Sequence, residues 1–170
     1  MSRRRTMLMN GQEENEVKEW QLIYDTKETA EEITSTSDIN VKGFNELMVI
    51  ARVVATTTNQ SARNGQLSLM SSDGNKRQVV LGSNLLYPNG NPRLSIALVK
   101  RVSDFIYVDT ATSWNANDVF NDKWAADNLI SMQNSIVKYE GEIDKIRITN
   151  ANESVTYKFG IGSRFAIYGR

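Results

Sequence analysis

The stretch FNELMVIARVVAT, residues 44–56, decides the fold of this chain. Successive side chains of a β-strand point to opposite faces of its sheet, so a strand shows alternation with a period of two residues. In this stretch both alternating sets are apolar. One set is Leu47, Val49, Ala51, Val53 and Ala55, and the other is Met48, Ile50 and Val54. A strand that is apolar on both faces is predicted to be central to two packed layers or to be covered by a partner.

Two hairpins are predicted after this strand. Residues 66–71 and 78–81 alternate on either side of Asp73-Gly74, a residue pair favoured in tight turns. Residues 94–100 and 105–108 form a second pair of runs, which is a hairpin or a bent strand interrupted at Asp104. The pairs Asn64-Gly65 and Asn89-Gly90 predict two further turns.

Strands are also predicted near both ends of the chain. Alternate residues of the run 20–24 share one side of a strand, and residues 145–149 alternate clearly. Residues 164–168 form a closing strand that follows Gly160 and Gly162. The two glycines predict a bulge or a close crossing of two backbones at this point.

Two segments have a weaker pattern. Thr29-x-x-Glu32 resembles a capping box, and the polar cluster 34–38 then allows at most about two turns of helix or an irregular strand. Residues 113–135 fit a short helix capped near Asn117 or a long loop with a helical turn. The complete pattern predicts an all-β fold: a β-sandwich or jelly roll of about eight antiparallel strands, with at most one or two short helices.

The length of 170 residues suits one domain. We expect a flexible N-terminal arm over residues 1–16 and a single β-sandwich domain over 17–170. Lys plus Arg and Asp plus Glu are each 20, so the formal net charge is zero, which predicts no nucleic-acid partner. No apolar run approaches the roughly 20 residues that span a bilayer, so no membrane insertion is expected. The apolar stretch at the N-terminus is too short for a signal peptide.

The residue types restrict the chemistry. The chain has no His and no Cys, which excludes Ser–His and Cys–His nucleophile pairs and zinc sites built from His and Cys. The polar cluster in residues 115–122 does not match a calcium loop, and no glycine-rich phosphate loop is present. The spacing of the carboxylates marks no pair for glycoside hydrolysis. The candidates for such a pair are Asp104, Asp109, Asp118, Asp122, Glu140 and Glu142. We therefore expect a non-enzymatic protein with no cofactor and no metal.

Five residues are candidates for contact with a ligand or partner. Trp114 and Trp124 lie in a polar context, where an exposed indole ring stacks readily on a sugar. Arg3, Arg4 and Arg5 precede a cluster of acidic residues, and that cluster argues against phosphate binding. We expect the arginines to dock on another subunit, and a plain disordered tail is the alternative.

Both ends of the chain resemble known proteins. RRRTMLM at residues 3–9, the acidic pair Glu13-Glu14 and WxxI at 20–23 resemble small tail proteins of long-tailed phages that infect Gram-positive bacteria. IxxIxI at residues 143–148 and FxxGSRFxIYG at 159–169 are similar to the last strands of many tailed-phage virion proteins. The resemblance covers the two ends alone, and neither motif is catalytic.

The resemblance implies a virion structural protein of the tail tip or baseplate that acts as an adaptor or host-attachment module. Such a protein is made in the host cytoplasm and ends in the virion. Its implied partners are other virion tail proteins, further copies of itself in the assembled particle, and carbohydrate on the host surface. The alternative is a carbohydrate-binding β-sandwich that recognises host cell-wall polysaccharide.

Overall fold

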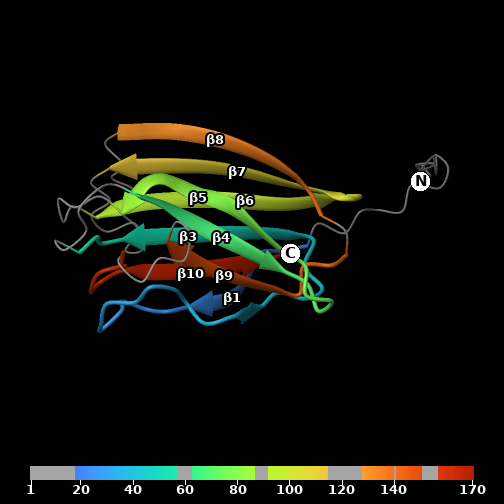
Figure 1. Cartoon of the computed structure of the whole chain (residues 1–170), viewed down its shortest axis with the longest axis horizontal. Coiled ribbons are helices and arrows are strands. Elements are labelled where there is room, and N and C mark those ends of the chain that lie inside the picture. Colours follow the sequence, from blue (N-terminus) through green and yellow to red (C-terminus); the bar gives the residue numbers. More distant parts are fainter. Residues whose placement is uncertain (1–17, 57–62, 87–91, 115–127, 140, 151–156) are drawn as a thin grey trace, which may run out of the picture.

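The computed structural model describes residues 18–56, 63–86, 92–114, 128–139, 141–150 and 157–170. These residues contain ten strands in two antiparallel sheets, and they contain no helix (Figure 1). The six-stranded sheet runs in the order β1 (Gln21–Asp25), β10 (Arg164–Gly169), β3 (Glu46–Val53), β6 (Arg93–Val102), β7 (Phe105–Trp114) and β8 (Asn128–Lys138). The four-stranded sheet runs in the order β2 (Ile39–Asn40), β9 (Lys145–Asn150), β4 (Arg63–Met70) and β5 (Lys76–Leu86).

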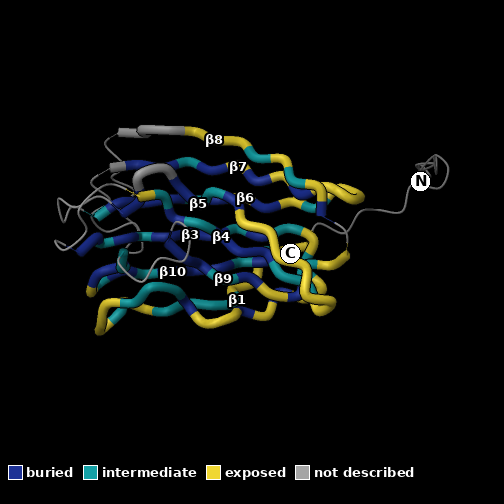
Figure 2. Tube along the Cα trace, in the orientation of Figure 1, coloured by how far each residue is buried: buried dark blue, intermediate teal, exposed yellow. Residues whose placement is uncertain are grey.

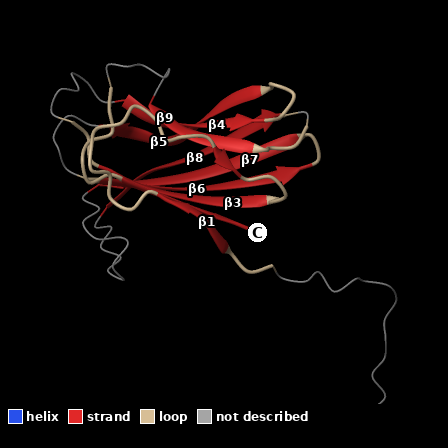
Figure 3. Cartoon of the chain, turned by 90° about the horizontal axis from the view of Figure 1, so that it is seen from below, coloured by secondary structure: helices blue, strands red, loops and turns tan. Residues whose placement is uncertain are grey.

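The two sheets pack face to face as a β-sandwich, which confirms the predicted fold class. Figure 3 shows the layers edge-on, with β4, β5 and β9 on one side and β1, β3 and β6 on the other. Between them, Val49, Ala51 and Val53 of β3 are fully buried. The facing sheet contributes side chains that are equally buried, namely Leu67, Leu69, Ile146 and Ile148. The core is therefore built from the inner alternation of both sheets.

The C-terminal strand closes the six-stranded sheet by inserting between β1 and β3. Before it, the chain crosses close to the end of β3, where the N–H of Gly160 donates to the carbonyl oxygen of Val54. A Cβ on Gly160 would lie 2.9 Å from that oxygen, and Gly162 has a φ of +83°. The Ser163 hydroxyl accepts a hydrogen bond from the N–H of Val54 at 3.0 Å. These contacts confirm the close backbone crossing predicted from the two glycines.

The first predicted hairpin is present, and the second pair of runs is a hairpin and not a bent strand. β4 and β5 are joined by a turn over residues 71–75, and β6 and β7 are joined by a two-residue turn at Ser103 and Asp104. The turn predicted at Asn64-Gly65 is wrong, because both residues lie within β4. The pairing of β4 with β5 shifts register on either side of Gly65, so the glycine marks an irregularity inside a strand. The turn predicted at Asn89-Gly90 lies outside the described residues.

Two sequence-based expectations need correction, and a third is decided between its alternatives. The described residues form ten strands in place of about eight. At Thr29-x-x-Glu32 they form no helix. Isolated bridges Ile33↔Phe159 and Ser35↔Thr149 follow there, in agreement with the irregular strand. In the segment 113–135, the short helix expected near Asn117 lies outside the described residues, and the residues from Asn128 onward belong to β8 in place of the expected loop or helix. Polar residues interrupt the apolar alternation of β8, which is why the sequence pattern did not reveal it.

We predict that Phe165→Ala lowers the free energy of unfolding by about 3–5 kcal/mol, the usual cost of truncating a buried phenylalanine. The Phe165 ring is fully buried and meets Phe159 edge to face, with ring centroids 5.0 Å apart. Urea denaturation measures the change. Ile161→Ala is the matched control, because Ile161 is 62% exposed and its truncation should change stability by less than about 0.5 kcal/mol. Equal effects of the two substitutions would contradict this account of the core.

Candidate functional site

The candidate site is the outer face of the six-stranded sheet, which is the face directed away from the four-stranded sheet. Residues paired across neighbouring strands share a face. Met48 of β3 pairs with Tyr168 of β10 and with Leu98 of β6, and Leu98 pairs with Asp109 of β7. Met48 and Ile50, the second apolar set of β3, are therefore directed to the outer face. None of the described residues covers this face with a third layer.

The centre of the outer face is a small apolar cluster. Ile50, Leu94 and Ala166 are each at most 9% exposed, and Met48, Ile96 and Tyr168 pack around them. The six residues come from β3, β6 and β10. This burial arises from lateral contact among side chains of one sheet, so the outer surface of the cluster stays open to another molecule.

An exposed apolar patch continues from this centre across β6, β7 and β8. Its members are Leu98, Val102, Phe105, Tyr107, Met132 and Ile136. Each is at least 38% exposed, and Met132 and Ile136 reach 72% and 64%. Figure 2 shows the exposed stretch of β8 at the rim of the sheet. Large apolar patches are uncommon on monomeric soluble proteins and usually mark a binding surface.

Ion pairs border the outer face at the end where β10 begins. Arg164 donates two hydrogen bonds to the carboxylate of Asp25, at 2.9 and 2.7 Å, which links β10 to β1. The Arg164 bonds lower the pKa of Asp25 far below its usual value, and the same contact raises the pKa of Arg164. Arg52 of β3 lies 3.9 Å from Glu28 and donates to the carbonyl oxygen of Gly162 at 2.7 Å.

A second group of ion pairs borders the opposite end. Glu46 at the start of β3 accepts hydrogen bonds from Lys100 of β6 at 2.8 Å and from Arg170 at 2.6 Å. These bonds lower the pKa of Glu46. The Arg170 guanidinium also stacks on the Trp20 ring, 4.6 Å from its centroid. These side chains, together with Leu98 and Asp109, line a pocket of about 230 Å³ at the edge of the apolar centre.

The arrangement has the anatomy of a protein-binding surface. Protein interfaces combine an apolar, desolvated centre with a polar rim that fixes register. Here the apolar cluster lies between two groups of ion pairs, and the exposed patch extends from it across β7 and β8. The ion pairs link β1 to β10 and β3 to β6. The ion pairs therefore fix the positions of the strands that form this face, and the face is suited to contact with a second apolar surface.

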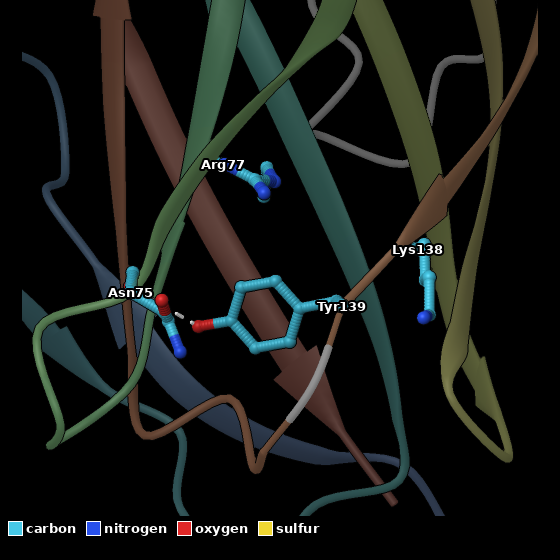
Figure 4. Close-up of a pocket in the computed structure, with 4 residues that line it drawn as sticks. All are labelled: Asn75, Arg77, Lys138 and Tyr139. Atoms are coloured by element: carbon cyan, nitrogen blue, oxygen red, sulfur yellow. Dashed lines mark hydrogen bonds between the residues drawn. The ribbon is translucent and has the colours of Figure 1, made fainter.

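A second, polar pocket of about 170 Å³ lies at the end of the sandwich where β8 ends (Figure 4). Asn75, Arg77, Lys138 and Tyr139 line it. The Tyr139 hydroxyl donates to the carbonyl oxygen of Asn75 at 3.3 Å, and burial of the ring raises the pKa of Tyr139. Because this ring is 2% exposed and belongs to the main core, its evident role is to close the end of the sandwich.

The residues predicted from the sequence are not brought together at this site. Trp114 ends β7, and its side chain lies outside the described part of the structure, as do Trp124, Arg3, Arg4 and Arg5. The polar cluster at 115–122 also lies outside it.

The described carboxylates from the sequence search are separated. Asp104 is in the β6–β7 turn, Asp109 is on the outer face, and Glu142 follows β8. Among the described residues, no group of three or more His, Cys, Asp or Glu is placed to hold a metal ion. Asp118, Asp122 and Glu140 lie outside the described residues.

Sequence reasoning did not identify the outer face as the candidate site, although a signal was present. Met48 and Ile50 stood out as a second apolar face of their strand, and Leu94, Ile96 and Leu98 formed an apolar face on theirs. The pairing of the two strands merges these sets into one surface. The pairing itself is not visible in the sequence.

Comparisons with protein-family models, with curated proteins and with solved structures found no match. Within the described ranges, no helix is long and apolar enough to cross a membrane. The interpretation of the site therefore depends on its own geometry.

We predict that the Asp25–Arg164 pair stabilises the protein at neutral pH and that acid removes this stabilisation. The pKa of Asp25 is lowered in the folded state, so its contribution is complete above the unfolded-state value near 3.9 and is lost as the pH falls below it. Asp25→Asn should cost about 1.5–3 kcal/mol at pH 7, the range for hydrogen bonds to charged groups. The variant should then lose less stability than wild type between about pH 5 and pH 2.

Urea denaturation at each pH measures both effects. Asp38→Asn is the control at pH 7, because it removes the more exposed contact with Arg147 and should cost at most about 1 kcal/mol. If wild type and Asp25→Asn lost equal stability on acidification, the proposed role of Asp25 would be wrong.

Proposed function

We propose that this protein works by assembly, as a structural protein of a phage tail tip or baseplate that serves as an adaptor or host-attachment module. The observation that carries the proposal is the outer face of the six-stranded sheet, with its apolar centre, its exposed apolar patch and its two bordering groups of ion pairs. A partner that covered this face would bury the second apolar side of β3.

The energetics favour an occupied outer face. Removing apolar surface from water contributes about 25 cal/mol per Å². Met132 and Ile136 are more than 60% exposed, and Leu98, Val102, Phe105 and Tyr107 are between 38% and 46% exposed. Burial of such a set against a complementary surface is the usual driving force of stable assembly, and the bordering charges give it orientation.

The choice of a phage particle rests on the sequence resemblance. The C-terminal motif at 159–169 spans the Gly160 crossing and the whole of β10. This motif therefore builds the strand that lies next to β3 in the sheet whose outer face carries the proposal. A virion module has to present one firm sheet surface to its neighbours, and a terminal strand that pairs on both sides, with β1 and β3, suits that requirement.

We predict that mass spectrometry of purified virions, from the phage that encodes this chain, detects the protein. A variant with Leu98→Lys and Tyr107→Lys should keep its β-type circular-dichroism spectrum, because both side chains are partly exposed, yet should be lost from the particles. Glu31→Lys, an exposed change elsewhere on the surface, is the control and should be incorporated normally. Absence of the wild-type protein from virions would refute the proposal.

Carbohydrate binding is the second candidate function, and the pocket beside Trp20 favours it. The pocket combines an aromatic ring, the apolar side chain of Leu98, and the carboxylates of Glu46 and Asp109. Small-ligand sites typically combine apolar walls with a few placed polar groups. This site differs from the one expected at Trp114 and Trp124, whose side chains lie outside the described residues.

We predict that, if this candidate is right, Trp20→Ala weakens binding to purified host cell-wall polysaccharide at least tenfold, about 1.4 kcal/mol. Isothermal titration calorimetry measures the affinity. Trp114→Ala and Trp124→Ala test the positions suggested by the sequence. The absence of any heat of binding to the wild-type protein would remove carbohydrate recognition as a function.

A further inference from the structure

One edge of β8 presents backbone hydrogen-bonding groups that no strand among the described residues pairs with. β8 ends the six-stranded sheet, and among the described residues β7 is its sole strand partner. The N–H of Tyr139 donates to the carbonyl oxygen of Asp104 at 2.8 Å, on the side of β7. Alternate residues of an antiparallel strand bond to the same neighbour. The backbone groups of Met132, Asn134 and Ile136 are therefore directed away from the sheet.

β8 lacks the protection that the other three sheet edges have. Natural edge strands are kept short or carry charges that prevent pairing with another chain. β1 has 5 residues and β2 has 2, and β5 begins with Lys76 and Arg77. β8 has 11 residues and no charged residue before Lys138. Of the four edges, β8 is the one best suited to pair with a further strand.

The side chains of β8 are complementary to a second copy of themselves. Met132, Asn134 and Ile136 pair with Ala111, Asp109 and Tyr107 of β7, so all three are directed to the outer face. In an antiparallel pairing centred on Asn134, Met132 of each copy would lie opposite Ile136 of the other, and the two Asn134 amides would face each other. In this register, each residue whose backbone N–H and C=O groups are directed outward lies opposite another such residue. The two strands can therefore form a ladder of hydrogen-bonded pairs.

The same register also places polar side chains opposite each other on the inner side of the sheet, and it brings no like charges together. Gln133 would lie opposite Ser135, which pairs polar residues with polar residues. Lys138 would lie opposite the uncharged position 130, so no like charges meet. A two-fold axis through Asn134 makes the contact isologous and closed, so pairing would stop at two copies.

We propose that β8 pairs antiparallel with β8 of a second copy of this chain, centred on Asn134, and joins two six-stranded sheets into one continuous sheet. The exposed apolar patches of the two copies then meet along the joint, because Met132 and Ile136 belong to the patch. The inference names the partner in the assembly function proposed above and rests on that function.

Charge variants test the register in the full-length protein. Wild type should elute and scatter light as a dimer in size-exclusion chromatography over a range of concentrations. Met132→Lys with Ile136→Lys places lysine opposite lysine twice in this register and should halve the measured mass. Met132→Lys with Ile136→Glu places opposite charges together and should restore the dimer. Leu22→Lys, 54% exposed at the opposite edge of the sheet, is the control and should remain dimeric.

A cysteine reporter gives an independent readout, because the chain has no cysteine of its own. Cα atoms of a hydrogen-bonded antiparallel pair lie about 5.5 Å apart, within the range that a disulfide spans. Asn134→Cys should therefore give a covalent dimer on mild oxidation, and Leu22→Cys should give none. Circular dichroism confirms that each variant is folded.

Three results would overturn the inference. They are a monomeric wild type at all concentrations, equal masses for the two charge variants, and oxidation at position 134 no faster than at position 22. The outcomes also separate this inference from the function on which it rests. A monomer that is present in virions refutes the pairing alone, and a dimer that is absent from virions refutes the virion role alone.

Discussion

The central constraint of this structure is that β3 carries apolar side chains on both faces. Val49, Ala51 and Val53 are sealed inside the sandwich, and Met48 and Ile50 lie on the other side of the same strand. The first set requires the four-stranded sheet as a cover. The second set packs laterally with side chains of β6 and β10, which reduces its contact with water but leaves the sheet surface open. The internal core and the candidate interface are thus two faces of one strand.

The strands around β3 keep that outer surface in one shape. β10 inserts beside β3 through the crossing at Gly160, where a side chain would collide with the backbone of Val54. Asp25 and Arg164 join β1 to β10 at one end, and Glu46 joins β3 to Lys100 of β6 and to Arg170 at the other. Charged groups that already bind each other need little rearrangement when a partner arrives, so less of the binding free energy is lost to ordering.

The outer face becomes progressively more exposed towards β8. Ile50 and Leu94 at its centre are nearly buried, Leu98 and Tyr107 are partly exposed, and Met132 is mostly exposed. This gradient ends at β8, whose outer edge pairs with no other strand of the described ranges. Apolar side chains and backbone groups without a strand partner among the described residues therefore coincide at one margin of the sheet, which supports the assembly role proposed above.

The sequence by itself determined the fold class and the first hairpin, because these depend on two-residue alternation and on turn chemistry between neighbouring residues. It left the second pair of strands as a hairpin or a bent strand, and the Gly160 segment as a bulge or a close crossing. It also showed that Met48 and Ile50 form a second apolar face. Tertiary structure alone decided that this face joins those of β6 and β10, that β8 is a strand, and that β8 is an edge. These features are set by pairing between strands that are distant in the sequence. β8 contains Gln133 and Asn134 among its apolar residues, so its strand character appears only when β7 pairs with it.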